Sequence, residues 1–260
     1  RKVVGELVDH GDVEVRLPPR DDTNPKLLNA RQVEAVCRSL AAKVHGTVDR
    51  GYFPLIIGGE DSVLMGIIEG FRRTLGPRIG LIYMDAHGDF NTPETTPSGL
   101  IGGMNVAITA GRGPKELVEM FSHSPLLPEE NIVLYGTREL DAMEERALEA
   151  SNVMVYTREK IREVGVKNGV KKILHDLEPR CDKVYVHVDL DVLDETAMSA
   201  QSLPVRDGLF MREFQKTLQG LVRNGRLCGM AIMVFNAAKD PGGVEARKVV
   251  RLIADILGSC

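Results

Sequence analysis

Short apolar runs alternate with longer amphipathic segments along most of the chain. The strand-like runs are 53–57, 79–84, 131–135, 153–156, 183–188 and 227–235. The segments with apolar residues at helical spacing are 27–45, 63–75, 115–121, 143–150, 169–177, 211–222 and 244–257. Two valine pairs, at 3–4 and 13–15, are further strand candidates near the start. Because strands and helices alternate, the sequence predicts an α/β fold with a mostly parallel sheet and helices on both faces.

One strand-like run ends in a cluster of potential metal ligands. Ile79–Met84 is followed by Asp85, His87 and Asp89, which alternate and therefore project to one side if the strand continues. Open parallel sheets place their ligand sites at the carboxyl ends of strands. Taken alone, the pattern is equally compatible with a polar turn after a core strand, so it does not decide between these two interpretations.

Two further strand ends carry carboxylates. Lys183–Val188 is followed by Asp189 and Asp191, and Phe53–Ile57 is followed by a glycine-containing turn that ends in Asp61. Burying such acids without partners would cost several kcal/mol each, so bound cations are the simplest explanation. Five carboxylates and one imidazole favour Mn²⁺ over Zn²⁺. The sequence therefore predicts two adjacent divalent cations at one edge of the sheet.

Composition restricts the class of protein. With 260 residues, of which 43% are hydrophobic, the chain is expected to form a single domain over residues 1–260. The net charge of −4 and the scattered Lys and Arg residues give no footprint for nucleic acid. No apolar run reaches the roughly 18 residues that span a bilayer, so no membrane insertion is expected. The four widely spaced cysteines favour reduced thiols and a cytoplasmic protein.

Three motifs, in this order and spacing, resemble the arginase and agmatinase (ureohydrolase) family. They are the GGxxS turn at 58–62, DAHGDFNTPETTPSG at 85–99 and DLDVLD at 189–194. The chain is most similar to the branch that contains the Nω-hydroxy-L-arginine amidinohydrolases. The features that indicate this branch are GGM at 102–104, HVDLDVLD at 187–194 and GMAIMVFNAAKDPGG at 229–243.

The resemblance implies a fold and an assembly. The fold is a three-layer αβα arrangement, shared with deacetylases, in which the sheet has about eight mostly parallel strands. Family members commonly begin with a further strand and helix, which the resemblance places upstream of Arg1 and outside this sequence. They also form trimers or hexamers, so a homo-oligomer is expected.

The resemblance also implies a dimanganese centre and a reaction. One ion would be held by Asp61, Asp85, Asp89 and Asp189, and the other by Asp85, His87, Asp189 and Asp191. Asp85 and Asp189 would bridge the two ions. A metal-bridging hydroxide, oriented by Asp89, would attack the carbon of a guanidino substrate and release urea or a urea derivative plus an amine.

The same resemblance assigns residues to the substrate. Asn91 and Ser98 match positions that contact the substrate carboxylate, while Asp141 and Glu144 match positions near its amino group. Asp89 and Asp141 are accordingly the candidate catalytic residues. Capping within the loop is the alternative explanation for Asn91 and Ser98, because Asn and Ser often have that role.

Four positions depart from the arginase pattern. Asp61 replaces a histidine ligand, Leu100 an asparagine of the substrate pocket, Gly102 a histidine proposed to shuttle protons, and Val234 a glutamate that holds the guanidinium. Neither Gly102 nor Val234 can replace the lost function, because a planar guanidinium is best fixed by a carboxylate and an amine leaving group needs an acid. These departures favour an N-hydroxylated guanidine or a less basic leaving group over arginine itself.

Two other functions stay open at this stage. The losses at Gly102 and Val234 are compatible with a catalytically silent homologue that acts as a structural or regulatory subunit. A mononuclear deacetylase-like hydrolase is a further alternative, because deacetylases share the fold implied here. The number of bound cations separates the three hypotheses, since two cations per chain would exclude the mononuclear enzyme and none would favour the silent homologue.

Overall fold

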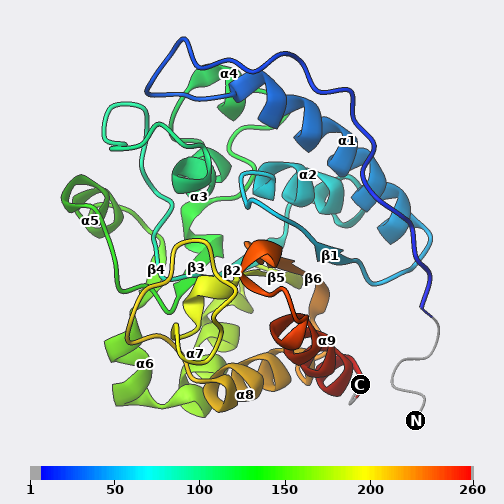
Figure 1. Cartoon of the computed structure of the whole chain (residues 1–260), viewed down its shortest axis with the longest axis vertical. Helices are drawn as coiled ribbons and strands as arrows, with labels where there is room; N and C mark the ends of the chain where they lie inside the picture. The colour runs from blue at the N-terminus through cyan, green and yellow to red at the C-terminus, as the bar shows by residue number, and fades with distance from the viewer. Residues whose placement is uncertain (1–6, 259–260) are drawn as a thin grey trace.

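A computed structural model of the chain describes residues 7–258 and contains one central sheet (Figure 1). In this range six strands, all parallel, lie in the order β1-β6-β5-β2-β3-β4. Their bounds are β1 Leu55–Ile57, β2 Ile79–Met84, β3 Ile132–Tyr135, β4 Met154–Tyr156, β5 Lys183–Asp189 and β6 Leu227–Met233. The mostly parallel sheet predicted from the sequence is therefore confirmed.

Helices cover both faces of the sheet and give three layers. Their bounds are α1 Ala30–Asp49, α2 Leu64–Leu75, α3 Asn105–Thr109, α4 Lys115–Val118, α5 Ala142–Glu149, α6 Arg158–Val164, α7 Val166–Leu177, α8 Met211–Val222 and α9 Val244–Leu257. Figure 1 shows α1 to α3 on one side of the sheet and α6 to α9 on the other. Three-residue 3₁₀ segments occur at 102–104, 129–131, 190–192 and 237–239.

The alternation of side chains along β2 divides the interior into two cores. Leu81 and Tyr83 join the core under α1 and α2, whereas Ile82 and Met84 join the core over α7, α8 and α9. All six β2 side chains are buried, as expected for the central strand of a parallel sheet that is covered on both faces. By the same alternation the side chain of Asp85, two residues beyond Tyr83, lies on the face of the sheet that α1 and α2 cover.

Close contact between α1 and α2 fixes the segment that leads out of β1. A Cβ atom built on Gly66 of α2 would lie only 2.5 Å from the carbonyl oxygen of Cys37 in α1. Gly70, one turn later, faces Val44 of α1 in the same way. The two glycines let the helix backbones approach closely, and this approach holds the start of α2 and the turn before it.

Among residues 7–258 the sheet contains six strands rather than about eight. Val13 and Val15, which were predicted to form a strand, lie in a segment without regular structure between residues 7 and 22, and Val13 packs against the α1–α2 core without strand pairing. The other candidate, at residues 3–4, lies outside the described residues. The helix α6 was not predicted, because Ile161 is its single fully buried apolar side chain and this leaves no helical periodicity in the sequence.

The strand order places a switch point beside β2. From β2 the chain moves outward through β3 to β4, and then returns to the opposite side of β2 to form β5 and β6. Crevices at the carboxyl ends of strands where the order reverses are the usual ligand sites of open α/β sheets. Asp85 and Asp189, which lie at the carboxyl ends of β2 and β5, border this crevice.

Two other features of the described chain bear on the earlier expectations. Cys37, Cys181 and Cys228 are free thiols, and Cys260 lies outside residues 7–258. In the same range, no helix combines the length and the apolar character needed to cross a membrane.

Candidate metal centre

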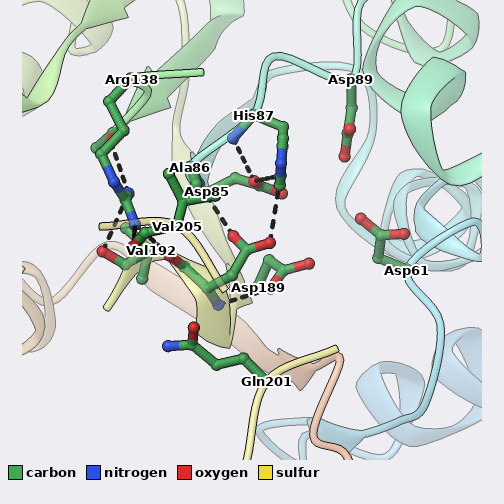
Figure 2. A network of polar contacts seen from close by, with 12 residues as sticks. Asp61, Asp85, Ala86, His87, Asp89, Arg138, Asp189, Val192, Gln201 and Val205 are labelled. Atoms are coloured by element: carbon green, nitrogen blue, oxygen red, sulfur yellow. Dashed lines mark hydrogen bonds and ion pairs between the residues drawn. The ribbon is translucent and has the colours of Figure 1, made fainter. Parts of the chain in front are cut away.

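Asp85 belongs to two groups of potential ligands. Its carboxylate lies with His87 and Asp191 in one group and with Asp61 and Asp189 in the other. Within each group one ligand atom per residue lies within 4.8 Å of the others. These are the groups of three or more such side chains found among residues 7–258, and they share Asp85. Figure 2 shows Asp61 and Asp89 on one side of Asp85 and Arg138 on the other.

Short turns fix the acidic residues at the ends of β2 and β5. The backbone N–H of His87 donates to Asp85 Oδ1 (2.6 Å), and the N–H of Asp191 donates to Asp189 Oδ1 (2.8 Å). In both cases an aspartate accepts from the residue two positions later, as Asp commonly does in turns. The N–H of Ala86 also donates to Asp191 Oδ1 (3.1 Å) and so joins the two strand ends directly.

His87 lies between two carboxylates. Its Nδ1 atom is 3.2 Å from Asp85 Oδ1 and 3.2 Å from Asp191 Oδ2. Burial alone would lower the pKa of His87, but the hydrogen bonds to Asp191 and Asp85 and their charges outweigh it and raise the pKa to about 11. A cation is therefore strongly favoured at this point, and a divalent ion would compete with the proton for the same imidazole.

Asp61 reaches the group from a distant strand. β6 and β5 separate β1 from β2, so the two strands lie about 14 Å apart at ordinary strand spacing. Asp61 nevertheless lies beside Asp85 and Asp189, because the turn after β1 runs back across the sheet. The N–H of Val234, at the end of β6, donates to the carbonyl of Gly59 (2.6 Å) and holds this turn in place.

Asp89 lies outside both groups, next to Asp61. The hydroxyl of Tyr83 is within hydrogen-bonding distance of the Oδ2 atoms of both carboxylates. Asp89 has a left-handed backbone (φ 49°), a conformation that Asp tolerates better than most residues. Its carbonyl accepts from the N–H groups of Val106 (3.1 Å) and Ala107 (3.2 Å), so the same residue also anchors the start of α3.

Tyr83 and Asn105 support these acids, and the sequence analysis did not identify either of them. Asn105 Nδ2 donates to the Tyr83 hydroxyl (3.0 Å) and lies 3.4 Å from Asp89 Oδ2. Both side chains are fully buried. The alternation of Tyr83 with Asp85 was a usable signal, since residues two apart on a strand share a face. No sequence signal indicated Asn105.

His187 packs behind Tyr83. The two rings stack with centroids 4.9 Å apart, and Nδ1 of His187 pairs with the hydroxyl of Tyr185 (2.9 Å). Burial lowers the pKa of His187 to about 4, so the ring is neutral. His187 is thus a core histidine that supports Tyr83.

The carboxylates carry a large electrostatic cost without a cation. Burial, with the charge of Asp191 second, raises the pKa of Asp85 to about 7. Burial and the charge of Asp85 also raise the pKa of Asp89 and Asp189 well above the usual range. Asp85 Oδ2 is a buried oxygen that lacks a hydrogen-bond partner in the described part of the chain. This donor set therefore fits divalent cations, which would relieve the repulsion and satisfy the orphaned oxygen.

The candidate substrate residues form a second network beside the acids. Asn91 Nδ2 donates to Asp141 Oδ2 (2.9 Å). Glu144, which is buried, accepts from the N–H groups of Phe90 (2.7 Å) and Asp141 (3.3 Å). Ser98 is exposed and accepts from the backbone N–H two residues later (3.2 Å). The structure thus links Asn91, Asp141 and Glu144 by hydrogen bonds, and it places Ser98 in a local turn.

Arg138 holds the loop that carries Asp191. Its guanidinium donates to the carbonyls of Asp191 (2.7 Å), Val205 (2.9 Å) and Arg206 (2.9 Å) (Figure 2). The residue follows β3, so it ties that strand end to the segment after β5. No pattern in the sequence indicated Arg138, because one arginine in a polar loop gives no signal about its partners.

Comparison with known proteins decides the family. A model described as "Arginase family" matches residues 4–258. The chain belongs to the arginase family. Arginase-family proteins hydrolyse C–N bonds of guanidino compounds, which are linear amidines, at a dinuclear metal centre. This chain is accordingly a hydrolase of that class, and the resemblance recognised in the sequence is confirmed.

Individual arginases match nearly the whole of this arginase-family chain. It is 31% identical over 255 residues to the arginase of Bacillus caldovelox, covering 97% of this chain and 85% of the relative. It is 33% identical over 251 residues to the arginase of Bacillus subtilis (strain 168), covering 96% and 83%. The solved native structure of the Bacillus caldovelox arginase superimposes with a TM-score of 0.90 and covers 96% of this chain and 84% of that chain.

Proposed function

We propose that this chain is a dimanganese amidinohydrolase that acts on Nω-hydroxy-L-arginine or a closely related guanidino compound. The products are urea or a urea derivative and an amine. The observation that carries the proposal is the pair of ligand groups that share Asp85. Five carboxylates and one imidazole form a mostly hard donor set, which supports Mn²⁺ over Zn²⁺.

The proposed ligand sets start from the two groups, with Asp89 added to the group of Asp61 and Asp189 added to the group of His87 and Asp191. One ion would be held by Asp61, Asp85, Asp89 and Asp189, and the other by Asp85, His87, Asp189 and Asp191. Asp89 joins the first set because it faces Asp61 across the Tyr83 hydroxyl. When bound, two neighbouring divalent ions lower the pKa of a water molecule and stabilise the charge that develops when water attacks the guanidino carbon.

Asp89 has an oxygen available to orient the attacking water. Tyr83 and Asn105 engage Oδ2 of this carboxylate and leave Oδ1 available to accept a hydrogen bond. The contacts of Tyr83 and Asn105 with Oδ2 hold the carboxylate in place, and the backbone carbonyl of Asp89 anchors the start of α3. Asp89 therefore directs the water toward the carbon and receives its proton at Oδ1.

The Asn91–Asp141 pair forms the other end of the substrate site. Asp141 is exposed and binds the substrate amino group, while Asn91 and Ser98 bind its carboxylate. Glu144 acts by fixing the backbone of Asp141 and Phe90. These roles suit an α-amino acid that carries a terminal guanidino group.

Two positions narrow the choice of guanidino group. Gly102 offers no acid for a strongly basic leaving amine, and Val234 is apolar. N-hydroxylation makes a guanidine less basic, so its binding depends less on a carboxylate at position 234. We further propose that residues 1–260 form one domain and that the protein is cytoplasmic and homo-oligomeric, as a trimer or hexamer.

The test is product release from the Mn²⁺-loaded chain offered arginine, Nω-hydroxy-L-arginine, agmatine and guanidinobutyrate in parallel. We expect turnover of Nω-hydroxy-L-arginine above that of the other three, with two ions bound per chain. Turnover of arginine at the highest rate would reject the substrate assignment. Bound metal without turnover of any compound would reject the amidinohydrolase, and absence of both would support the silent homologue.

A further inference from the structure

Glu60 lies beside the candidate metal centre and has no assigned role. It directly precedes Asp61 in the turn after β1, and its Oε2 atom accepts a hydrogen bond from the Ser62 N–H (3.1 Å). The residue is exposed, whereas Asp61 is buried. It also lines the large groove between α1 and the β1 edge, although none of the six potential ligands does. Glu60 is therefore at the surface beside the buried Asp61.

Gly102 leaves the space that the Glu60 carboxylate occupies. A Cβ atom built on Gly102 would lie 2.4 Å from Glu60 Oε1 and 2.8 Å from Asp61 Oδ1. Even the smallest side chain at this position would thus displace one of these oxygens. Because Gly102 has no side chain, the Glu60 carboxylate can lie next to Asp61, at the edge of the ligand group.

Val234 fixes the same turn from the other side. It has a left-handed backbone (φ 60°), which is strained for a β-branched residue. In this conformation its N–H donates to the carbonyl of Gly59, the residue before Glu60 (2.6 Å). Backbone strain of this kind is often found at functional sites. Here the strained residue holds the peptide that carries Glu60.

Glu60 also lacks a cationic partner. Across residues 7–258, no Lys, Arg or His forms an ion pair with it. Asp141 and Glu144 form no ion pair in the same range either, but Asp141 accepts from the Asn91 amide and Glu144 accepts from two backbone N–H groups. A carboxylate at an exposed residue, without an ion-pair partner, can bind a cationic group of a substrate.

We propose that Glu60 binds the guanidino group of the substrate and is the residue that selects a cationic, planar group at this site. The inference rests on the proposed amidinohydrolase function and deepens it. A carboxylate can accept two parallel N–H bonds from a guanidinium, and this geometry selects it over an ammonium or a neutral urea.

The test measures binding rather than turnover, with methylguanidinium as the probe and methylurea as its uncharged analogue. The Mn²⁺-loaded full chain is titrated by calorimetry as wild type, Glu60→Gln and Glu60→Asp, with bound metal counted in each sample. We expect Glu60→Gln to weaken methylguanidinium binding by at least about tenfold, since a charge-assisted pair is lost. Glu60→Asp should retain part of the affinity, and methylurea should bind weakly to all three.

Glu163→Gln is the matched control, because it removes the same charge from an exposed position in α6. It should leave methylguanidinium binding unchanged. Three results would overturn the proposal: equal affinity in wild type and Glu60→Gln, no measurable binding to wild type, or loss of a bound ion in Glu60→Gln, which would make Glu60 a metal ligand. Failure of all guanidino substrates to turn over, with binding still dependent on Glu60, would reject the reaction and keep the binding role.

Discussion

The hydroxyl of Tyr83 lies between the carboxylates of Asp61 and Asp89 and is within hydrogen-bonding distance of both. A hydroxyl has one proton to donate, so the two acids share it. The side-chain amide of Asn105 in turn donates to the Tyr83 hydroxyl. Asp61 follows β1 and Asp89 follows β2, so this one side chain links turns from two strands that are not adjacent. Residues that support metal ligands in this way commonly tune metal affinity.

Replacing Tyr83 with phenylalanine is expected to weaken Mn²⁺ binding by about tenfold to a hundredfold. The ring and its packing on His187 remain, but Asp61 and Asp89 lose their shared donor. Competition with a chelator of known affinity measures the change. Tyr135→Phe is the matched control, because it removes a buried hydroxyl that bonds Thr217 away from the acids. Equal affinities for the two variants would contradict a role for Tyr83.

Replacing Asp189 with asparagine is expected to reduce the bound Mn²⁺ from two ions per chain to one or none and to reduce turnover to background. Asp189 shares a ligand group with Asp61 and Asp85, and an amide brings no charge to offset the cation. Elemental analysis after dialysis gives the ion count. The exposed Asp182, which pairs with Arg78, supplies the control as Asp182→Asn. Two ions retained in Asp189→Asn would remove this residue from the ligand set.

Arg138→Lys is expected to lower Mn²⁺ affinity by about tenfold while the chain stays folded. A lysine keeps the charge, but it cannot reach the carbonyls of Asp191, Val205 and Arg206 together. The Asp191 loop should then be held less firmly. A metal titration measures the affinity for Mn²⁺, and a separate circular dichroism spectrum shows whether the variant is folded. Arg180→Lys, at an arginine that donates to the Glu130 carbonyl, is the control. Unchanged metal affinity in Arg138→Lys would limit Arg138 to a role in stability.

Two glycines in helices should respond to alanine in opposite directions. Gly66→Ala places a methyl group against the backbone of Cys37 and is expected to lower the free energy of unfolding by about 1–3 kcal/mol. Gly169, in α7, has no atom within 4 Å of an added Cβ. Gly169→Ala should raise the free energy of unfolding by about 0.5–1 kcal/mol, since alanine favours a helix. Urea denaturation measures both, and a tolerated Gly66→Ala would mean that α1 and α2 can separate at little cost.

For helices and strands with a clear hydrophobic period, the first and last residues predicted from the sequence match the structure. The predicted ranges of β2, α8 and α9 agree with the structure, because burial on one or both faces leaves a clear period in the sequence. β1 is shorter than predicted and starts at Leu55 rather than Phe53. Phe53 is exposed at the edge of the sheet. Aromatic residues are common in strands, so its presence extended the predicted strand although its backbone pairs with no neighbouring strand.

The sequence by itself determined which strand ends carry acids. Asp85 and Asp189 follow buried runs directly, and parallel strands bring their carboxyl ends to one edge, so their proximity follows from local periodicity and fold class. Only the tertiary structure brings Asp61 next to these two carboxylates, because the turn after β1 must cross the ends of β6 and β5 to reach them. The placement of Tyr83 between two acids and of Glu60 over Gly102 has the same origin. Loop paths depend on contacts between residues far apart in the chain, and such contacts leave no period that a sequence reveals.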